Sequence, residues 1–271
     1  HFSIHQKNEP IPLHTSDEFG DLADALNIIA EDLNNFDDYQ RAFISNISHD
    51  FRSPLTSIHG YAQAMLDGTI PYEAQEKYLN IILSETDRLT NLTSNLLELN
   101  SFNGDNVLLD ITTFNICETI VQTVNTLEGT AAKKEISFVL DYNTQKELLV
   151  EADESKIHQV LYNLIDNAVK FSHNNSEIKI SLRKKGAKVF VSVKDSGIGI
   201  PKESLNKVFD RFYKTDISRG KDKRGTGLGL SISKEIIQAH NQTINVVSTV
   251  DVGTEFVFTL KYHSKKQEAS S

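Results

Sequence analysis

The chain has little cysteine and little proline, and it lacks any apolar run long enough to cross a membrane. Its 271 residues include one cysteine, Cys117, and five prolines. A single cysteine excludes an intrachain disulfide and fits a reducing compartment. Without about 18 consecutive apolar residues, no segment is expected to span a bilayer. The first residues also lack the charged-then-apolar pattern of a signal peptide.

The charge balance argues against one class of partner. The formal net charge is −9, and an acidic surface repels the phosphate backbone of nucleic acids. A hydrophobic content of 39% still allows a sizeable core, as in an ordinary soluble globular protein. We therefore expect no nucleic-acid partner and look for a folded domain with an acidic surface.

The first hundred residues carry a helical pattern. From Ser16 or Asp17, either of which can cap a helix, apolar residues recur every three or four positions as far as Met65. Residues 67–71 break the pattern with Gly and Pro, and a second pattern covers 73–100. Two helices of about 28 residues each predict an antiparallel hairpin. Because one hairpin cannot bury both apolar stripes, we expect a homodimer that forms a four-helix bundle.

The second half has the composition of an α+β domain. Its helices and strands do not alternate as regular βαβ units, which favours an α+β sandwich over a doubly wound sheet. The expected domains are a linker at 1–38, a helical hairpin at 39–104, an α+β domain at 105–263 and a disordered tail at 264–271. We expect helices at 115–132 and 154–172, a Gly-rich loop and helix over 225–240, and strands at 136–142, 146–151, 177–183 and 188–195, with a final strand pair ending at 260.

His49 is a candidate nucleophile in the first helix. The apolar stripe there includes Ile47, Phe51 and Leu55, and at about 100° per residue His49 falls almost opposite it. A neutral imidazole has a free nitrogen lone pair, and the neighbouring Asp50 can hold the proton on the other ring nitrogen. By itself this pair is also compatible with an ordinary solvated helix face.

The helix expected at 154–172 carries a polar face suited to a nucleotide. Asn163, Asn167 and Lys170 lie at i, i+4 and i+7, hence on one face. Amide oxygens suit a hard cation such as Mg²⁺, and an ammonium suits phosphate. Without other motifs, this pattern would indicate only a polar helix face.

Further motifs follow in order along the chain. Asp195 ends a strand and can accept a bond from the amine of adenine, while Gly197 and Gly199 allow the backbone to approach the ring. Arg211 suits a phosphate. A Gly-rich turn at the start of a helix offers N–H donors to an anion, and its residues are Gly225, Thr226, Gly227, Leu228 and Gly229. The basic segment 213–224 between them fits either a lid over phosphates or a solvated loop.

The motif in the first helix resembles the H box of HisKA-type sensor histidine kinases, usually written S-H-E-L-R-T-P-L. In this chain it reads Ser48-His49-Asp50-Phe51-Arg52-Ser53-Pro54-Leu55. The resemblance implies His49 as phosphoacceptor and Asp50, in place of the usual Glu, as general base. Ser53 stands where many members have the Thr or Asn used in the reverse, phosphatase reaction.

The later motifs resemble the N, G1, F and G2 boxes of the HATPase_c catalytic domain. This likeness implies a fold of the gyrase and histidine-kinase type and a site for ATP with Mg²⁺. It implies Asn167 as the Mg²⁺-binding amide, Asn163 and Lys170 near the phosphates, Asp195 on adenine and Phe171 beside the base. Gly253-Thr254 resembles a late glycine motif of the domain, and Asn241 replaces a frequent glycine at a turn.

The resemblance implies that the chain phosphorylates His49 and passes the phosphoryl group to an aspartate of a response regulator. Residues 17–33 resemble the second helix of a HAMP linker, which implies a membrane helix upstream and a cytoplasmic place for this part. Two other functions stay open. One is a clamp-like ATPase of the gyrase and Hsp90 class, and the other is a catalytically silent scaffold that docks a response regulator.

Overall fold

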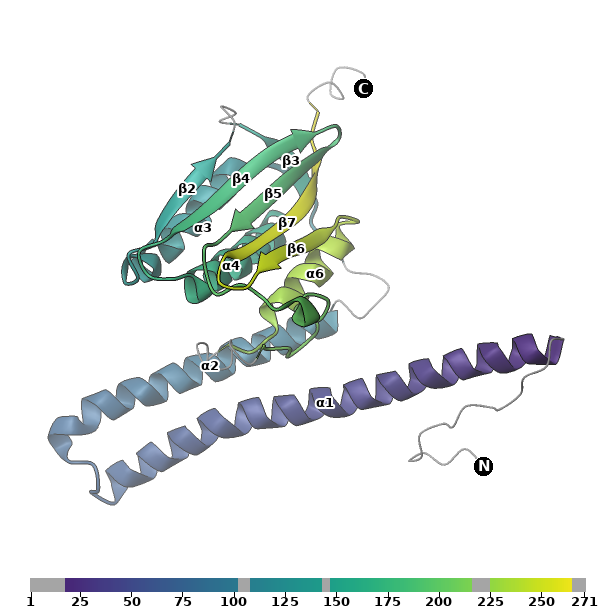
Figure 1. The fold of residues 1–271 in the computed structure, drawn as a ribbon. Helices are drawn as coiled ribbons and strands as arrows, with labels where there is room; N and C mark the ends of the chain where they lie inside the picture. The colour runs from purple at the N-terminus through teal and green to yellow at the C-terminus, as the bar shows by residue number, and fades with distance from the viewer. Residues whose placement is uncertain (1–17, 102–107, 143–146, 216–224, 265–271) are drawn as a thin grey trace. The chain divides into compact units, whose positions relative to one another are not determined.

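The computed structural model describes residues 18–101, 108–142, 147–215 and 225–264 (Figure 1). The chain divides into two compact units, residues 1–89 and 90–271, which we describe separately. Residues 1–17 of the predicted linker, residues 216–224 of the basic segment expected as a lid or a solvated loop, and the tail beyond residue 264 lie outside the described residues. In the described part of the chain, no helix combines the length and hydropathy needed to cross a membrane.

The first unit is a helical hairpin, as the periodicity predicts. Helix α1 spans Glu18–Leu66 as one unbroken helix of 49 residues, so no break separates the expected linker from the hairpin. After a single 3₁₀ turn, η1 (Tyr72–Ala74), helix α2 spans Gln75–Ser101, and its residues from 90 on belong to the second unit. Near the turn the rings of Tyr61 and Tyr78 pack with centroids 5.1 Å apart. This contact and the turn fix the register of the two helices.

The second unit is built on one mixed sheet of seven strands. The strand order is β1-β3-β7-β5-β4-β2, and β6 pairs with β7. The β2–β4 pair is parallel and the other pairs are antiparallel. The strands are β1 (Thr112–Asn115), β2 (Ser137–Asp141), β3 (Leu149–Ala152), β4 (Glu177–Lys185), β5 (Lys188–Lys194), β6 (Ile244–Thr249) and β7 (Gly253–Tyr262). Strand β1 was missed in the sequence.

Three helices cover one face of this sheet (Figure 1). They are α3 (Ile116–Ala132), α4 (Glu154–Phe171) and α6 (Gly229–Ala239), and α4 packs between the other two. Helix α4 begins at Asp153, whose side chain accepts a hydrogen bond from the backbone N–H of Lys156 at 3.2 Å, a typical N-cap. The predicted α+β sandwich is therefore confirmed.

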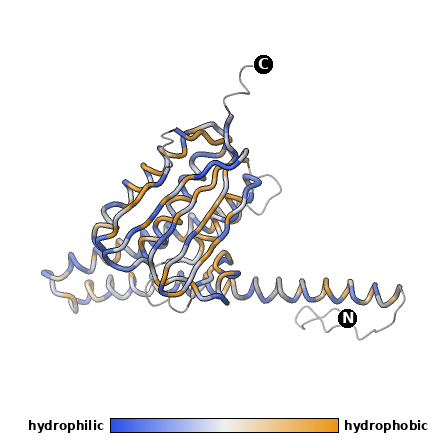
Figure 2. The backbone as a smooth tube through the Cα atoms, turned by 45° about the horizontal axis from the view of Figure 1, so that its top comes forward, coloured by the Kyte–Doolittle hydropathy of each residue, from blue (hydrophilic) through white to orange (hydrophobic). Residues whose placement is uncertain are grey.

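The core lies between the sheet and these helices. Along β4, β5 and β7 every second side chain is apolar and turned inward, and Figure 2 shows the resulting alternation. Each such burial stabilises the fold by roughly 1.5–3 kcal/mol. The inward residues of the central strands are Ile178, Ile180, Leu182, Val189, Val191, Val193, Phe256, Phe258 and Leu260. This packed layer gives α4 and the end of β5 a rigid support.

Candidate functional site

The side chain of His49 projects from α1 into solvent. It is 83% exposed, whereas the neighbouring Asp50 is only 16% exposed. The Nδ1 atom of His49 lies 3.5 Å from Oδ1 of Asp50, within ion-pair range but longer than a formed hydrogen bond. A carboxylate on the Nδ1 side leaves Nε2 facing outward. The helical-wheel prediction that His49 is exposed is thus confirmed.

The turn of α1 after His49 has a weakened backbone. Pro54 lies inside α1 and has no N–H to donate to the carbonyl of Asp50. Ser53 is exposed, and its carbonyl accepts a bond from the hydroxyl of Ser57 at 3.2 Å. The hydroxyl of Ser53 therefore sits on the surface one helical turn from His49, where a partner could contact both residues.

A cavity opens in the second unit between α4, the loop after β5 and the start of α6. Most of the nucleotide-binding residues expected from the sequence line it: Asn163, Asn167, Lys170, Phe171, Asp195, Gly199, Gly225, Thr226, Gly227 and Gly229. Residues from three separate stretches of sequence thus meet around one space. The cavity combines an acidic group, two amides, an ammonium and a Gly-rich turn, which is the polar set that a nucleotide needs.

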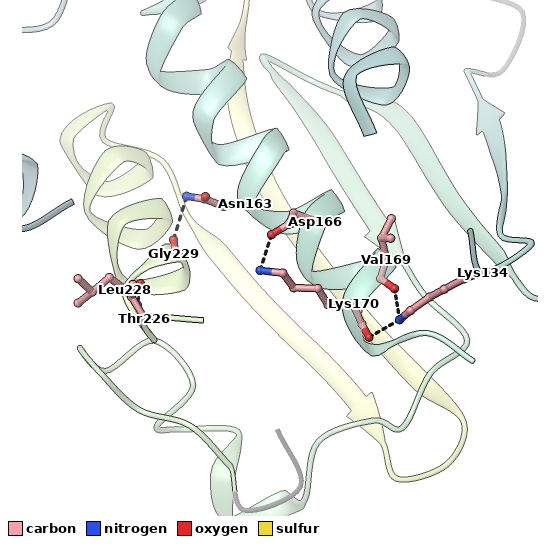
Figure 3. Close-up of polar contacts among 8 residues, drawn as sticks. All are labelled: Lys134, Asn163, Asp166, Val169, Lys170, Thr226, Leu228 and Gly229. Atoms are coloured by element: carbon pink, nitrogen blue, oxygen red, sulfur yellow. Dashed lines mark hydrogen bonds and ion pairs between the residues drawn. The ribbon is translucent and has the colours of Figure 1, made fainter. Parts of the chain in front are cut away.

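Helix α4 directs its polar face into this cavity (Figure 3). Asn163 donates through Nδ2 to the carbonyl of Gly229 at 3.2 Å, which ties α4 to the first turn of α6. The ammonium of Lys170 lies 2.7 Å from a carboxylate oxygen of Asp166. Because this pair is one helical turn apart and partly exposed, Lys170 can exchange Asp166 for a phosphate oxygen at little cost.

The residues present fit Mg²⁺ only together with a nucleotide. Among the described residues, no group of three or more His, Cys, Asp or Glu side chains could hold a metal ion. The amide oxygen of Asn167 and the carboxylate of Asp166 both line the cavity and are oxygen ligands that suit a hard cation. Since Mg²⁺ commonly takes one or two protein ligands plus phosphate oxygens, this set agrees with a Mg²⁺–triphosphate.

Asp195 forms the buried end of the cavity. Its side chain is 5% exposed, and Oδ1 accepts bonds from the backbone N–H groups of Gly197 at 2.9 Å and Thr254 at 3.2 Å. Burial raises the pKa of Asp195 to about 6, although these two hydrogen bonds oppose the shift. With Oδ1 occupied, Oδ2 is the oxygen that can accept a bond from a ligand amine.

Two glycines of this loop allow a close approach of backbones. A Cβ at Gly197 would stand 2.3 Å from the carbonyl oxygen of Phe171, and one at Gly199 would stand 2.1 Å from that of Thr249. Gly199 also has φ +67°, a left-handed conformation that disfavours other residues. Both positions require glycine, although only Gly199 lines the cavity itself.

The Gly-rich turn is held in a defined shape at the start of α6. Gly227 has φ +71°, and its carbonyl accepts a bond from the backbone N–H of Phe212 at 2.9 Å. The hydroxyl of Thr226 accepts a bond from the N–H of Leu228 at 3.3 Å (Figure 3). The unpaired N–H groups of the first turn of α6 therefore lie beside the cavity, where the helix dipole favours an anion.

Three of the expected ligands do not line the cavity: Gly197, described above, Arg211 and Leu228. Arg211 pairs with Glu235 of α6, with 3.2 Å between Nη2 and Oε1, so it links the segment before residue 216 to α6. Leu228 is fully buried beneath the Gly-rich turn. The phosphate-binding role of Arg211 stays a prediction, and Leu228 acts through its backbone and its packing.

The sequence missed several residues of the cavity wall. Thr254 was noted only as part of a glycine motif, yet its N–H holds Asp195 and its side chain lines the cavity. Tyr162, Ile198 and Phe256 supply apolar surface from three different elements. These residues are far apart in the sequence and meet only in the folded domain, so no local sequence pattern predicts their place in the cavity wall. The turn at Asn241, in contrast, has the expected positive φ, +55°.

Both parts of the chain match known families. Residues 39–104 match the His Kinase A (phospho-acceptor) domain, and residues 152–264 match the histidine kinase-, DNA gyrase B-, and HSP90-like ATPases. Neither match reaches residues 17–33, so the HAMP likeness stays a prediction.

Curated relatives include the sensor histidine kinase WalK of Bacillus subtilis, which is 35% identical over 237 residues. That alignment covers 86% of this chain and 38% of WalK. The sensor protein kinase WalK of Staphylococcus aureus is 35% identical over 226 residues, covering 82% of this chain and 53% of the relative. This chain therefore spans less than two thirds of the length of these relatives.

Solved structures include the catalytic domain of histidine kinase ThkA, 36% identical, with a TM-score of 0.50 and coverage of 56% of this chain and 95% of that one. The complex of ThkA with the response regulator protein TrrA contains a chain 31% identical to this one, with a TM-score of 0.67 and coverage of 83% and 62%. With the exposed His49–Asp50 pair and the cavity around Asp195, these matches place the chain in the family of HisKA/HATPase_c sensor histidine kinases.

Proposed function

We propose that the chain uses ATP to phosphorylate its own His49 and then transfers the phosphoryl group to an aspartate of a response regulator. The observation that carries the proposal is the 83% exposed imidazole beside a shielded carboxylate, on a chain that also holds a cavity lined by Asp195, two amides and an ammonium. A clamp-like ATPase would use the cavity but gives the exposed His49–Asp50 pair no role.

In this mechanism Nε2 of His49 attacks the γ-phosphorus of ATP. The new N–P bond forms as the bond to the β,γ-bridging oxygen breaks, and ADP leaves with that electron pair. Asp50, on the Nδ1 side, holds the ring proton and stabilises the positive charge that develops on the imidazole. Transfer to the regulator breaks the N–P bond and forms an acyl phosphate on the aspartate.

The cavity residues position the nucleotide for this step. Asp195 accepts a bond from the adenine amine, while Lys170 and the N–H groups at the start of α6 face the phosphates. Asn167, with Asp166, would hold Mg²⁺, which neutralises phosphate charge when bound. Phosphoryl transfer needs mainly positioning and charge neutralisation, and these residues supply both.

Assembly with partners forms the second part of the proposal. A homodimer would cover a series of apolar side chains that the single hairpin leaves more than two-fifths exposed: Leu22, Leu26, Ile29, Leu33, Ile44 and Leu55 on α1, and Leu79 and Leu83 on α2. The complex of the relative ThkA with the response regulator protein TrrA supports a receiver domain as partner. We also propose that this part lies on the cytoplasmic side of a membrane-anchored sensor and that Ser53 contributes to a phosphatase reaction.

Incubation with γ-labelled ATP and Mg²⁺ tests the activity. The wild-type chain and a variant with His59→Gln, an exposed histidine ten residues further along α1, should both take up label. His49→Gln should take up none while it binds ATP as tightly as the wild type, because the cavity is unchanged. Label retained in His49→Gln would refute the assignment.

The stability of the label in acid and base distinguishes a histidine kinase from a clamp-like ATPase. A phosphohistidine is stable in base and is lost in acid, whereas an ATPase without a phosphoenzyme leaves no label on the chain. ATP turnover without any labelled protein would favour the clamp, and failure to bind ATP at all would favour a silent scaffold.

A further inference from the structure

The ammonium of Lys134 contacts the C-terminus of helix α4, although Lys134 and the end of α4 are far apart in the sequence. Lys134 follows α3, and its Nζ atom donates to the carbonyl of Val169 at 2.8 Å and to that of Lys170 at 2.6 Å (Figure 3). A cation at this end of a helix bonds the unpaired carbonyls and also interacts favourably with the helix dipole. Both contacts are charge-assisted and short.

The last backbone carbonyls of α4 need hydrogen-bond donors from outside the helix. The helix ends in Ser172, which is extended (φ −61°, ψ 152°) and lacks the left-handed residue that often closes a helix. The N–H of Ser172 bonds to Ala168, so the next three carbonyls have no partner within the helix. Lys134 accounts for two of these three. The third, on Phe171, accepts the N–H of Ile198 at 3.2 Å.

The backbone of the same turn holds the chain just beyond α4. The carbonyl of Lys134 accepts the N–H of Asn175 at 2.9 Å, and the N–H of Ser137 donates to the carbonyl of Ser176 at 3.0 Å. The turn between α3 and β2 therefore contacts residues on both sides of the C-terminus of α4. The side chain of Lys134 fixes the helical side of this junction.

The junction between the turn at Lys134 and the end of α4 positions residues on two sides of the nucleotide cavity. Lys170 and Phe171 line the cavity from α4. Residue 172 forms an isolated antiparallel bridge with Gly197, whose N–H in turn bonds to Asp195. A shift of the last turn of α4 would therefore move the phosphate side and the adenine side together.

We propose that Lys134 is a positioning residue for nucleotide binding, acting through the C-terminal turn of α4. The proposal rests on the proposed use of this cavity for ATP. Lys134 itself does not touch the cavity, and its effect reaches the nucleotide through Lys170, Phe171 and the bridge to Gly197.

Amide hydrogen exchange on the full nucleotide-free chain tests the structural link without reference to ATP. In Lys134→Met, which keeps the length of the side chain and removes its charge, the N–H groups of Ser172 and Ile198 should exchange at least about tenfold faster. Those of β5 should be unchanged, because they belong to the central sheet. Lys133→Met, at the exposed neighbour, should leave all of them as in the wild type. Unchanged exchange at Ser172 and Ile198 would overturn the proposal.

Nucleotide binding and kinetics test the functional link. Lys134→Met should raise the Kd and KM for Mg-ATP about tenfold and change kcat less than threefold, since the reacting groups are intact. Lys134→Arg, which keeps the charge and the donors, should recover most of the loss. Equal falls in kcat and kcat/KM, or no recovery in the arginine variant, would contradict a positioning role.

The controls separate this proposal from the proposed function. If the wild type binds no ATP, the use of the cavity for ATP fails, whereas the exchange result still decides the link between Lys134 and α4. If the wild type and Lys134→Met bind ATP equally, only the positioning role of Lys134 fails.

Discussion

The buried carboxylate of Asp195 should contribute a destabilising free energy to the nucleotide-free protein at neutral pH that is absent in acid. Burial raises its pKa from an ordinary value of 3.8 to about 6. At about 1.4 kcal/mol per pKa unit, the ionised form costs the native state about 3 kcal/mol. The sign follows from linkage. The native state holds the proton more tightly, so this cost is absent well below pH 3.8, grows as the pH rises toward 6 and is constant above 6.

The substitution Asp195→Asn removes the ionisation and keeps the shape. The Asn Oδ1 can still accept the N–H groups of Gly197 and Thr254, so its amide nitrogen takes the place of Oδ2. We expect the variant to be more stable than the wild type by up to about 3 kcal/mol at pH 8 and by less than about 1 kcal/mol at pH 4. Urea denaturation of both proteins across this range measures the difference.

The same variant should bind ATP about a hundredfold more weakly, because two donors, the Asn amide and the adenine amine, then face each other. Titration calorimetry with Mg-ATP at pH 8 measures this loss. A variant that is less stable than the wild type at pH 8, or that binds ATP unchanged, would refute the reasoning.

Asp153 provides a control, because its ionisation should change the free energy of unfolding in the opposite direction. Burial would raise its pKa, but hydrogen bonds from the side chain of Ser155 and the N–H groups of Lys156 and Asp110 lower it below its ordinary value. Its ionised form therefore stabilises the native state above pH 3.8, and this contribution is lost as the pH falls through the lowered pKa. Asp153→Asn should accordingly be less stable at pH 8, with the difference vanishing in strong acid.

Two further substitutions test the cavity. Gly199→Ala should destabilise the chain by about 2 kcal/mol or more, because the new Cβ meets the carbonyl of Thr249 and the backbone is left-handed there. Urea denaturation measures this, and a loss below about 0.5 kcal/mol would contradict the geometry. Lys170→Met should leave stability almost unchanged, since its pair with Asp166 contributes about 0.3–0.5 kcal/mol. It should nevertheless weaken Mg-ATP binding at least about tenfold in calorimetry, and tight binding by this variant would remove Lys170 from the phosphate site.

The helical elements could be predicted because their signals are local. The 3.6-residue period of α4 separates a polar face with Asn163 and Lys170 from the buried Leu164 and Ile165, and the structure confirms both faces. The exposure of His49 follows from the same geometry on α1. Neither result depends on which other segments pack nearby.

The parts that sequence reasoning missed depend on distant partners. Strand β1 is four residues long and exists because it pairs with β3, about 40 residues further on. Arg211 has the right chemistry for phosphate, but Glu235 lies within 3.2 Å of it. No sequence motif includes Lys134, because only the fold brings it to the end of α4. Residue type and spacing carry no information about such pairings.

The two sites of the chain differ in what the fold supplies. Asp195 and Gly199 are held in unfavourable states, a buried charge and a left-handed backbone, and the packed sheet and the hydrogen bonds around them keep them there. His49 lies on a single helix with its ring exposed to water, and the carboxylate of Asp50 lies beside one of its nitrogens. Substitutions that loosen the core should therefore reduce nucleotide binding before they affect the reactivity of His49. A phosphoryl group already on His49 should pass to its partner even in a chain whose nucleotide cavity has been disabled.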